Sequence, residues 1–188
     1  MITKMKKHAQ ASFKTRPKRK LPEDLIAPEA MAQWTIQSSY MAHKTASPQV
    51  RAVAHRADQP DLVLSGGQDG QVLLYSVENS KVQRNFTGHK KPINALLYHP
   101  SREVVVSASD DKTVRMWIDR SLLFPRLFVD ERPTVFKQHS GEVKGLSLQP
   151  CGDYFVSCAT DNTWSFYDIA SARVVQSFDA GLAGKGGR

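Results

Sequence analysis

The sequence has few cysteines and no long apolar run, and both absences exclude classes of protein. Its two cysteines, Cys151 and Cys158, are too few for a disulfide scaffold and have no CxxC spacing for a metal. We interpret both as reduced, which suits a cytosolic or nuclear protein. No stretch approaches 18 apolar residues, so no membrane span is expected. No apolar run follows the basic N-terminus, so no secretory signal is expected.

Acidic residues are absent from the first 20 positions, which hold eight of the 26 lysines and arginines. Residues 21–188 therefore balance 18 bases against 18 acids, and the net charge of +8 belongs to the N-terminal segment. A globular domain that grips a nucleic-acid backbone needs a basic face, which this balance does not favour. We predict that residues 1–33 form a disordered basic tail or linker.

The basic run in this tail, Arg16, Lys18, Arg19 and Lys20, has three interpretations. It has the composition of a nuclear import signal. It is equally typical of a solvated linker that keeps the chain soluble. A third interpretation is weak binding to phosphates, independent of base sequence, which would make any nucleic-acid contact a property of the tail alone.

From Trp34 onward, short apolar runs recur between turn residues, and none is long enough for a typical helix. Alternation of apolar and polar residues, as in 114–117, favours strands joined by tight turns. Residues 180–188 are rich in glycine, and we expect them to be disordered.

Three segments repeat the same four polar or aromatic positions. In each segment a histidine lies upstream, a serine lies four residues before an aspartate, and an aromatic residue lies six residues after that aspartate. The sets are His43, Ser65, Asp69 and Tyr75; His89, Ser107, Asp111 and Trp117; and His139, Ser157, Asp161 and Tyr167. The aspartates are 42 and then 50 residues apart.

This period, the Gly88-His89 pair and the aromatic at the end of each third strand resemble WD repeats, the blades of a β-propeller. The resemblance implies an all-β fold: a partial WD-repeat β-propeller of about three four-stranded blades in an open arc. We place this domain at residues 34–179, with a stray strand near Trp34–Ile36 and blades at about 43–86, 87–137 and 138–179. Third strands are expected near 71–75, 113–117 and 163–167.

The resemblance implies a structural role for each set of four residues. The aspartate carboxylate accepts a hydrogen bond from the histidine ring, the other ring nitrogen meets the serine, and the serine meets the polar hydrogen of the aromatic residue. A buried carboxylate needs such partners. Tyr75 and Tyr167 replace the usual tryptophan, although a phenol can also donate.

A Ser-His-Asp hydrolase triad is the alternative interpretation of the same residues. It is not favoured, because the constellation occurs three times and no GxSxG motif is present. The three histidines belong to different repeats, so we predict no metal site, and we predict no cofactor.

Finer motifs resemble one WD-repeat family, that of pre-mRNA-processing factor 19, the spliceosomal U-box ubiquitin ligases. They are Lys18–Leu25 before the blades, Gly88–Ile93, Tyr98–Ser101, His139–Leu148 and Gly152–Tyr154. The resemblance implies a nuclear protein-interaction scaffold for pre-mRNA splicing, protein ubiquitination and DNA repair. Its expected partners are splicing-complex subunits and ubiquitination substrates.

The chain also departs from that family. The family has a U-box, a coiled coil that forms homo-oligomers and a seven-bladed propeller, whereas residues 1–33 are too short and polar for a U-box and no heptad segment is present. We therefore expect no ubiquitin ligase activity from this chain by itself. Three blades are compatible with a fragment, a truncated isoform or an erroneous gene sequence. A generic WD-repeat adaptor of another nuclear complex and a nucleic-acid binder acting through its tail are the alternative functions.

Partner-binding residues are expected on one rim of the blades, because loops on rigid scaffolds carry function. The candidates are Lys44, Gln68, Lys90, Lys91 and Asp110, although ordinary surface polarity explains them equally well. Asp110 is expected to be solvated in its turn.

An open arc also leaves two sheet faces uncovered. We expect Val53, Leu64 and Leu73 on the first, and Leu146, Phe155 and Phe166 on the last.

Overall fold

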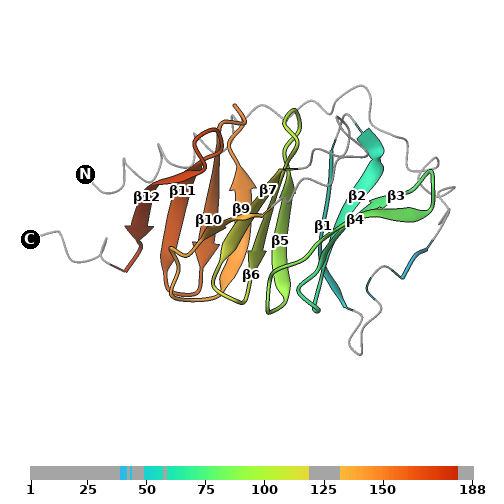
Figure 1. The fold of residues 1–188 in the computed structure, drawn as a ribbon. Coiled ribbons are helices and arrows are strands. Elements are labelled where there is room, and N and C mark those ends of the chain that lie inside the picture. The colour runs from blue at the N-terminus through green and yellow to red at the C-terminus, as the bar shows by residue number, and fades with distance from the viewer. Residues whose placement is uncertain (1–38, 42, 44–48, 57–58, 119–131, 182–188) are drawn as a thin grey trace, which may run out of the picture. The chain divides into compact units, whose positions relative to one another are not determined.

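The computed structural model describes residues 39–41, 43, 49–56, 59–118 and 132–181. These residues form twelve strands (Figure 1). No helix long and apolar enough to cross a membrane occurs among them. The predicted basic tail with Arg16, Lys18, Arg19 and Lys20, the stray strand near Trp34–Ile36, and Lys44 all lie outside the described residues.

The strands form three four-stranded antiparallel sheets, each built from consecutive strands. The first sheet contains β1 (Val50–Arg56), β2 (Gln59–Gly67), β3 (Val72–Ser76) and β4 (Lys81–Phe86). The second contains β5 (Ile93–Tyr98), β6 (Val104–Ser109), β7 (Val114–Ile118) and β8 (Thr134–Phe136). The third contains β9 (Val143–Leu148), β10 (Tyr154–Ala159), β11 (Thr163–Asp168) and β12 (Arg173–Asp179). This confirms the predicted all-β fold of three unclosed four-stranded blades.

The turn between the second and third strands has the same backbone form in every sheet. The residue after each repeat aspartate has a positive φ: 74° at Gly70, 70° at Lys112 and 62° at Asn162. Glycine and asparagine tolerate this conformation, whereas it strains a lysine backbone. The turn directs each aspartate back toward the histidine of its own repeat, as the contacts below show.

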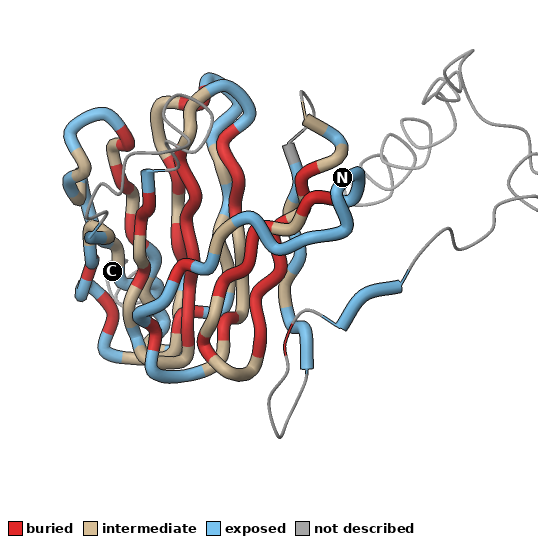
Figure 2. Tube along the Cα trace, turned by 45° about the vertical axis from the view of Figure 1, so that its right-hand side comes forward, coloured by how far each residue is buried: buried red, intermediate tan, exposed pale blue. Residues whose placement is uncertain are grey.

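Two apolar cores lie between the sheets, one at each boundary. Strands β2 and β3 of the first sheet pack Leu64, Val72 and Leu74 against Ile93 and Trp117 of the second. Figure 2 shows the buried residues gathered along the inner strands of the stacked sheets. Burial on both sides explains why all six residues of β6 are buried.

The second core joins the second and third sheets. Val106, Val114 and Met116 pack there against Phe155 and Tyr167. The ring of Phe155 stacks on that of Tyr167, with centroids 4.6 Å apart. The continuous apolar contact fixes the third sheet beside the second.

Some residues expected on open faces are in fact buried. Leu64 and Phe155 are fully buried and Leu73 nearly so, whereas Val53 is exposed. Successive strand residues point to opposite faces, and Leu64 and Phe155 lie on the faces that meet the second sheet. Leu146 and Phe166 are partly buried.

Candidate functional site

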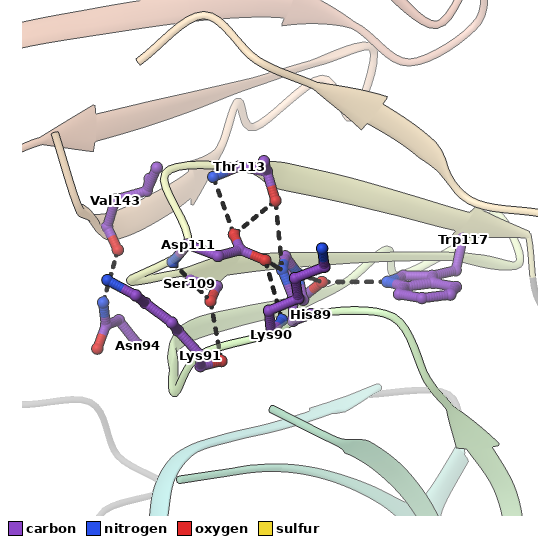
Figure 3. A network of polar contacts seen from close by, with 10 residues as sticks. His89, Lys90, Lys91, Asn94, Ser109, Asp111, Thr113, Trp117 and Val143 are labelled. Carbon is purple, nitrogen blue, oxygen red and sulfur yellow. Dashed lines mark hydrogen bonds and ion pairs between the residues drawn. The ribbon is translucent and has the colours of Figure 1, made fainter. Parts of the chain in front are cut away.

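The second repeat forms a continuous chain of side-chain contacts from its turn to its core (Figure 3). The Nδ1 atom of His89 lies 2.8 Å from Asp111 Oδ2, and its Nε2 atom lies 2.8 Å from Ser107 Oγ. The indole nitrogen of Trp117 donates to the same serine oxygen at 3.1 Å. His89, Ser107 and Trp117 are buried, so the chain of contacts fastens the segment before β5 to β6 and β7.

Asp111 accepts further hydrogen bonds around its turn. The backbone nitrogen of Lys90 donates to Oδ2 at 3.2 Å, and the hydroxyl of Thr113 donates to Oδ1 at 2.6 Å. Burial by itself would raise the pKa of Asp111, but the hydrogen bonds from His89 and Thr113 outweigh it and hold the pKa well below its usual range. The carboxylate is therefore charged at neutral pH, as a structural acceptor requires.

The third repeat closes its network through a threonine. His139 Nε2 lies 2.6 Å from Ser157 Oγ, which lies 3.0 Å from the Tyr167 hydroxyl. The other ring nitrogen of His139 lies 2.8 Å from Thr163 Oγ1 and 3.6 Å from Asp161 Oδ1. The threonine two residues after the aspartate, present in the second and third repeats, belongs to each network, although the repeated pattern of four residues does not include it.

Electrostatics in the third repeat follow from its burial. Desolvation lowers the pKa of His139, although nearby Asp161 opposes the shift. Burial would raise the pKa of Asp161, but hydrogen bonds from Thr163 and from the backbone of Gly141 and Ser140 lower it well below its usual range. Burial raises the pKa of the Tyr167 phenol. The aspartate thus supplies the negative charge of this network.

The first repeat lacks the last of the four contacts. His43 Nδ1 lies 3.1 Å from both Asp69 oxygens, and its Nε2 lies 3.1 Å from Ser65 Oγ. Tyr75, however, makes no hydrogen bond to Ser65 within the described residues. Its ring stacks on Tyr40 at 4.4 Å, with 22° between the planes. Tyr75 therefore does not complete the network of the first repeat as the structure describes it.

None of the three networks presents a nucleophile to a substrate. The hydroxyls of Ser65, Ser107 and Ser157 are buried between a histidine and the core of their sheet. No group of three or more histidine, cysteine or acidic side chains that could hold a metal occurs within the described ranges. The geometry therefore favours a structural role, in which each network fixes the backbone of the loops that form the rim.

The candidate partner-binding residues on the rim differ in their solvent exposure. Lys90 and Lys91 are exposed, and the carbonyl of Lys91 accepts the Ser109 hydroxyl at 3.0 Å. Gln68 is partly buried, and its backbone nitrogen donates to Gln49 at 2.8 Å. Two exposed lysines on an anchored backbone are therefore the accessible part of the predicted set.

Asp110 is not the solvated turn residue that was expected. Its side chain is only 14% exposed and contacts all three sheets. It accepts from Asn94 Nδ2 of β5 at 2.5 Å, from Lys144 Nζ of β9 at 2.6 Å and from Arg51 Nη1 of β1 at 3.2 Å. Burial would raise the pKa of Asp110, but the hydrogen bonds from Asn94 and Lys144 lower it. Asp110 therefore joins the sheets on this rim.

A second set of contacts joins two sheets at the other ends of their strands. The Nε2 atom of His99 donates to the carbonyl of Gly152 at 2.7 Å, while its Nδ1 accepts from the backbone nitrogen of Arg102 at 2.8 Å. The Arg102 guanidinium pairs with Asp153 at 2.7 Å. Together with the Asp110–Lys144 contact, these bonds join the second and third sheets at both ends of their strands.

Comparison with known proteins agrees with this architecture. The WD domain, G-beta repeat family matches residues 80–117 and 131–168. Among solved structures, the computationally designed Ika8 protein aligns with a TM-score of 0.56 and 22% identity, over 69% of this chain and 36% of that one. That likeness concerns the fold alone.

Related sequences specify the class further. Pre-mRNA-processing factor 19 from Bos taurus is 30% identical over 93% of this chain, which spans 34% of that protein. Pre-mRNA-processing factor 19 homolog 2 from Arabidopsis thaliana is 30% identical over 91% of the chain and 31% of that protein. The Caenorhabditis elegans protein is 32% identical over 81% of the chain and 29% of that protein. The chain thus spans about a third of the length of these relatives.

The repeats, the three sheets and the buried networks define a WD-repeat protein. Within that class, the chain belongs with the WD region of pre-mRNA-processing factor 19.

Proposed function

We propose that the three-sheet unit is a nuclear protein-interaction scaffold of the pre-mRNA splicing machinery. The observation that carries this proposal is the similarity to pre-mRNA-processing factor 19, which extends over 93% of the chain. Its proposed partners are subunits of a splicing complex. Presentation of ubiquitination substrates and a part in DNA repair are further roles that we propose only for an assembly that supplies the ligase itself.

The rim supports this proposal because its backbone is fixed before a partner arrives. The backbone nitrogen of Lys90 is held by Asp111, and the carbonyl of Lys91 is held by Ser109. Their side chains are exposed, so binding would order little besides the side chains themselves. Paired lysines on a fixed backbone suit an acidic segment of a protein partner.

The test is co-purification of the tagged chain with spliceosomal small nuclear RNAs from nuclear extract, measured with a probe for each RNA. We expect the wild-type chain to retain them and Lys90→Glu/Lys91→Glu to reduce retention at least tenfold. The matched control is Lys81→Glu/Arg173→Glu, which makes the same charge change at exposed positions that begin β4 and β12. Equal retention by both variants would refute the rim assignment. Failure of the wild-type chain to retain any of these RNAs would refute the splicing role.

A further inference from the structure

Arg115 of β7 belongs neither to the buried networks nor to the rim residues described above. Alternate strand residues share a face, so Arg115 lies on the side of β7 that carries Trp117, which packs in the core between the first and second sheets. Its side chain reaches Gly88, in the segment between β4 and β5. A Cβ atom at Gly88 would overlap Arg115 Nη1 and would lie 3.4 Å from Trp117 Cη2. The guanidinium therefore lies over the backbone of Gly88, beside the Trp117 ring.

The guanidinium of Arg115 has no acceptor among the described residues. Its Nε atom is enclosed and makes no hydrogen bond there, and no carboxylate of the described ranges pairs with its terminal nitrogens. By contrast, Arg51 and Arg102 each pair with an aspartate. An arginine stays charged and carries five donors, and an enclosed donor without an acceptor is destabilising. Arg115 thus has hydrogen-bonding capacity that the described fold does not use.

The other two repeats show that this position does not require an arginine. Leu73 and Ser165 occupy it, four residues after the repeat aspartate. Leu73 is nearly buried. Ser165 is fully buried, and its hydroxyl oxygen lies 2.8 Å from that of Ser177. An apolar or a small polar side chain therefore satisfies the fold here, and the charge of Arg115 is particular to the second repeat.

Gly88 is particular to the second repeat as well. The residue before the repeat histidine is Ala42 in the first repeat and Gln138 in the third. Glycine therefore stands at this position only in the repeat that carries the arginine, and its missing side chain leaves the space that Arg115 Nη1 occupies. The two residues form one feature, a charged planar group and the backbone that gives it room.

We propose that Arg115, seated on Gly88, binds an anionic side chain of a protein partner, either a carboxylate or a phosphorylated hydroxyl. A guanidinium donates two parallel hydrogen bonds to either group. A partner can reach the site, because Thr87 and Gly88 are exposed and Arg115 is partly exposed. Val135, which pairs with Arg115 across β7 and β8, is 38% exposed.

The site adds an anchor to the proposed binding rim. Lys90 and Lys91 follow Gly88 by two and three residues and are exposed. Their flexible ammonium groups attract an acidic segment, whereas the planar guanidinium fixes the geometry of one acceptor. The inference rests on the proposed function in taking a protein as the partner. Its test contains no splicing component, so the site and the splicing role can fail separately.

Nuclear magnetic resonance of the 188-residue chain tests the site through the Nε–Hε signal of Arg115 and the backbone amides of Thr87 and Gly88. The probes are three short glycine-serine peptides that differ at one central residue, which is glutamate, phosphoserine or serine. We expect the glutamate and phosphoserine peptides to shift these signals to saturation, and the serine peptide to leave them unchanged. The anionic peptide that binds more tightly identifies the group that the partner supplies.

Substitutions separate binding by Arg115 from general attraction to a basic surface. Arg115→Leu, which introduces the residue type of the first repeat, should raise the dissociation constant of the anionic peptides at least tenfold, measured at the Gly88 amide. Arg115→Lys keeps the charge but loses the planar fork, and it should give an intermediate constant. Arg173→Leu, at an exposed position that begins β12, removes the same charge and should leave the constant unchanged.

Thermal stability distinguishes a binding residue from a structural one. Because Arg115 has no acceptor in the described fold and Leu73 fills the same position, Arg115→Leu should keep or raise the melting temperature. A lower melting temperature in this variant would overturn the proposal, since Arg115 would then serve the fold. Shifts confined to the amides of Lys90 and Lys91, equal shifts with the serine peptide, or no shift with either anionic peptide would also overturn it.

Discussion

The carboxylate of Asp111 holds together the segment before β5 and the turn between β6 and β7. We expect Asp111→Ala to lower the free energy of unfolding by about 1.5–3 kcal/mol, because the change removes hydrogen bonds to a charged acceptor and takes the carboxylate partner away from His89 Nδ1. Urea denaturation measures the difference. Asp153→Ala, which removes an exposed ion pair with Arg102, should cost about 1 kcal/mol or less. Equal costs would show that the buried network contributes no special stability.

The two repeat tyrosines differ in whether the hydroxyl contacts the serine of its own repeat. Tyr167 makes this contact and Tyr75 does not. Tyr167→Phe should destabilise by about 1 kcal/mol, because its buried hydroxyl lies in hydrogen-bond contact with Ser157. Tyr75→Phe should change stability by about 0.5 kcal/mol or less, because its ring is held by stacking on Tyr40. Thermal melts of the two variants make the comparison. A larger loss for Tyr75→Phe would contradict the contacts described here.

His139 gives the fold a dependence on pH with a definite sign. Its pKa is lowered in the folded chain by burial, whereas the pKa of a histidine in an unfolded chain is about 6.5. The unfolded state therefore takes up protons first as the pH falls below that value, and folding stability declines. We expect the fall in melting temperature between pH 7.5 and 5.5 to be smaller in His139→Gln than in the wild type. His55→Gln, at an exposed position of β1, is the control and should keep the full decline.

At the scale of strands and turns, the sequence predicts what lies within one sheet. Third strands expected at 71–75, 113–117 and 163–167 are observed at Val72–Ser76, Val114–Ile118 and Thr163–Asp168. The spacing of serine, aspartate and aromatic residue is the same in all three repeats because the same hairpin geometry repeats. The sequence therefore shows the same strand pattern three times. A local sequence pattern is therefore sufficient to predict a contact when both residues belong to the same repeat.

Contacts between sheets were not predictable in the same way. Asp110 has no polar counterpart of the same charge in the other repeats, and its partners Arg51 and Lys144 lie 59 and 34 residues away in sequence. The burial of Phe155 likewise depends on which face of the third sheet meets the second. Strand alternation defines two faces but does not say which one has a neighbour, so these features needed the packed structure.

The Asp110–Lys144 contact couples the second sheet to the third. Asp110 raises the pKa of Lys144 by accepting a hydrogen bond from it, but the lysine is largely solvated. A double-mutant cycle of Asp110→Ala and Lys144→Ala should therefore give a coupling free energy of about 0.2–1 kcal/mol. Because the pair is partly exposed, the coupling should shrink in about 1 M salt, where the Debye length is about 3 Å. A salt-independent coupling would indicate that Lys144 acts through packing instead.

At the scale of the whole unit, the described sheets are unequally supported. All six residues of β6 are buried, whereas β12 contains no fully buried residue. In stacked repeats, stability is approximately a sum of the stability of each unit and of its contacts with its neighbours. Among the described residues, the second sheet contacts two neighbouring sheets, and the first and third sheets contact one each. The middle sheet should therefore be the last to open.

Native-state hydrogen exchange measures this order directly. Amides of β6 should exchange only through global unfolding, whereas those of β12 should exchange through local opening at a lower free energy, because its residues have little apolar contact to lose. Equal opening free energies in β6 and β12 would show instead that the three sheets unfold as one cooperative unit.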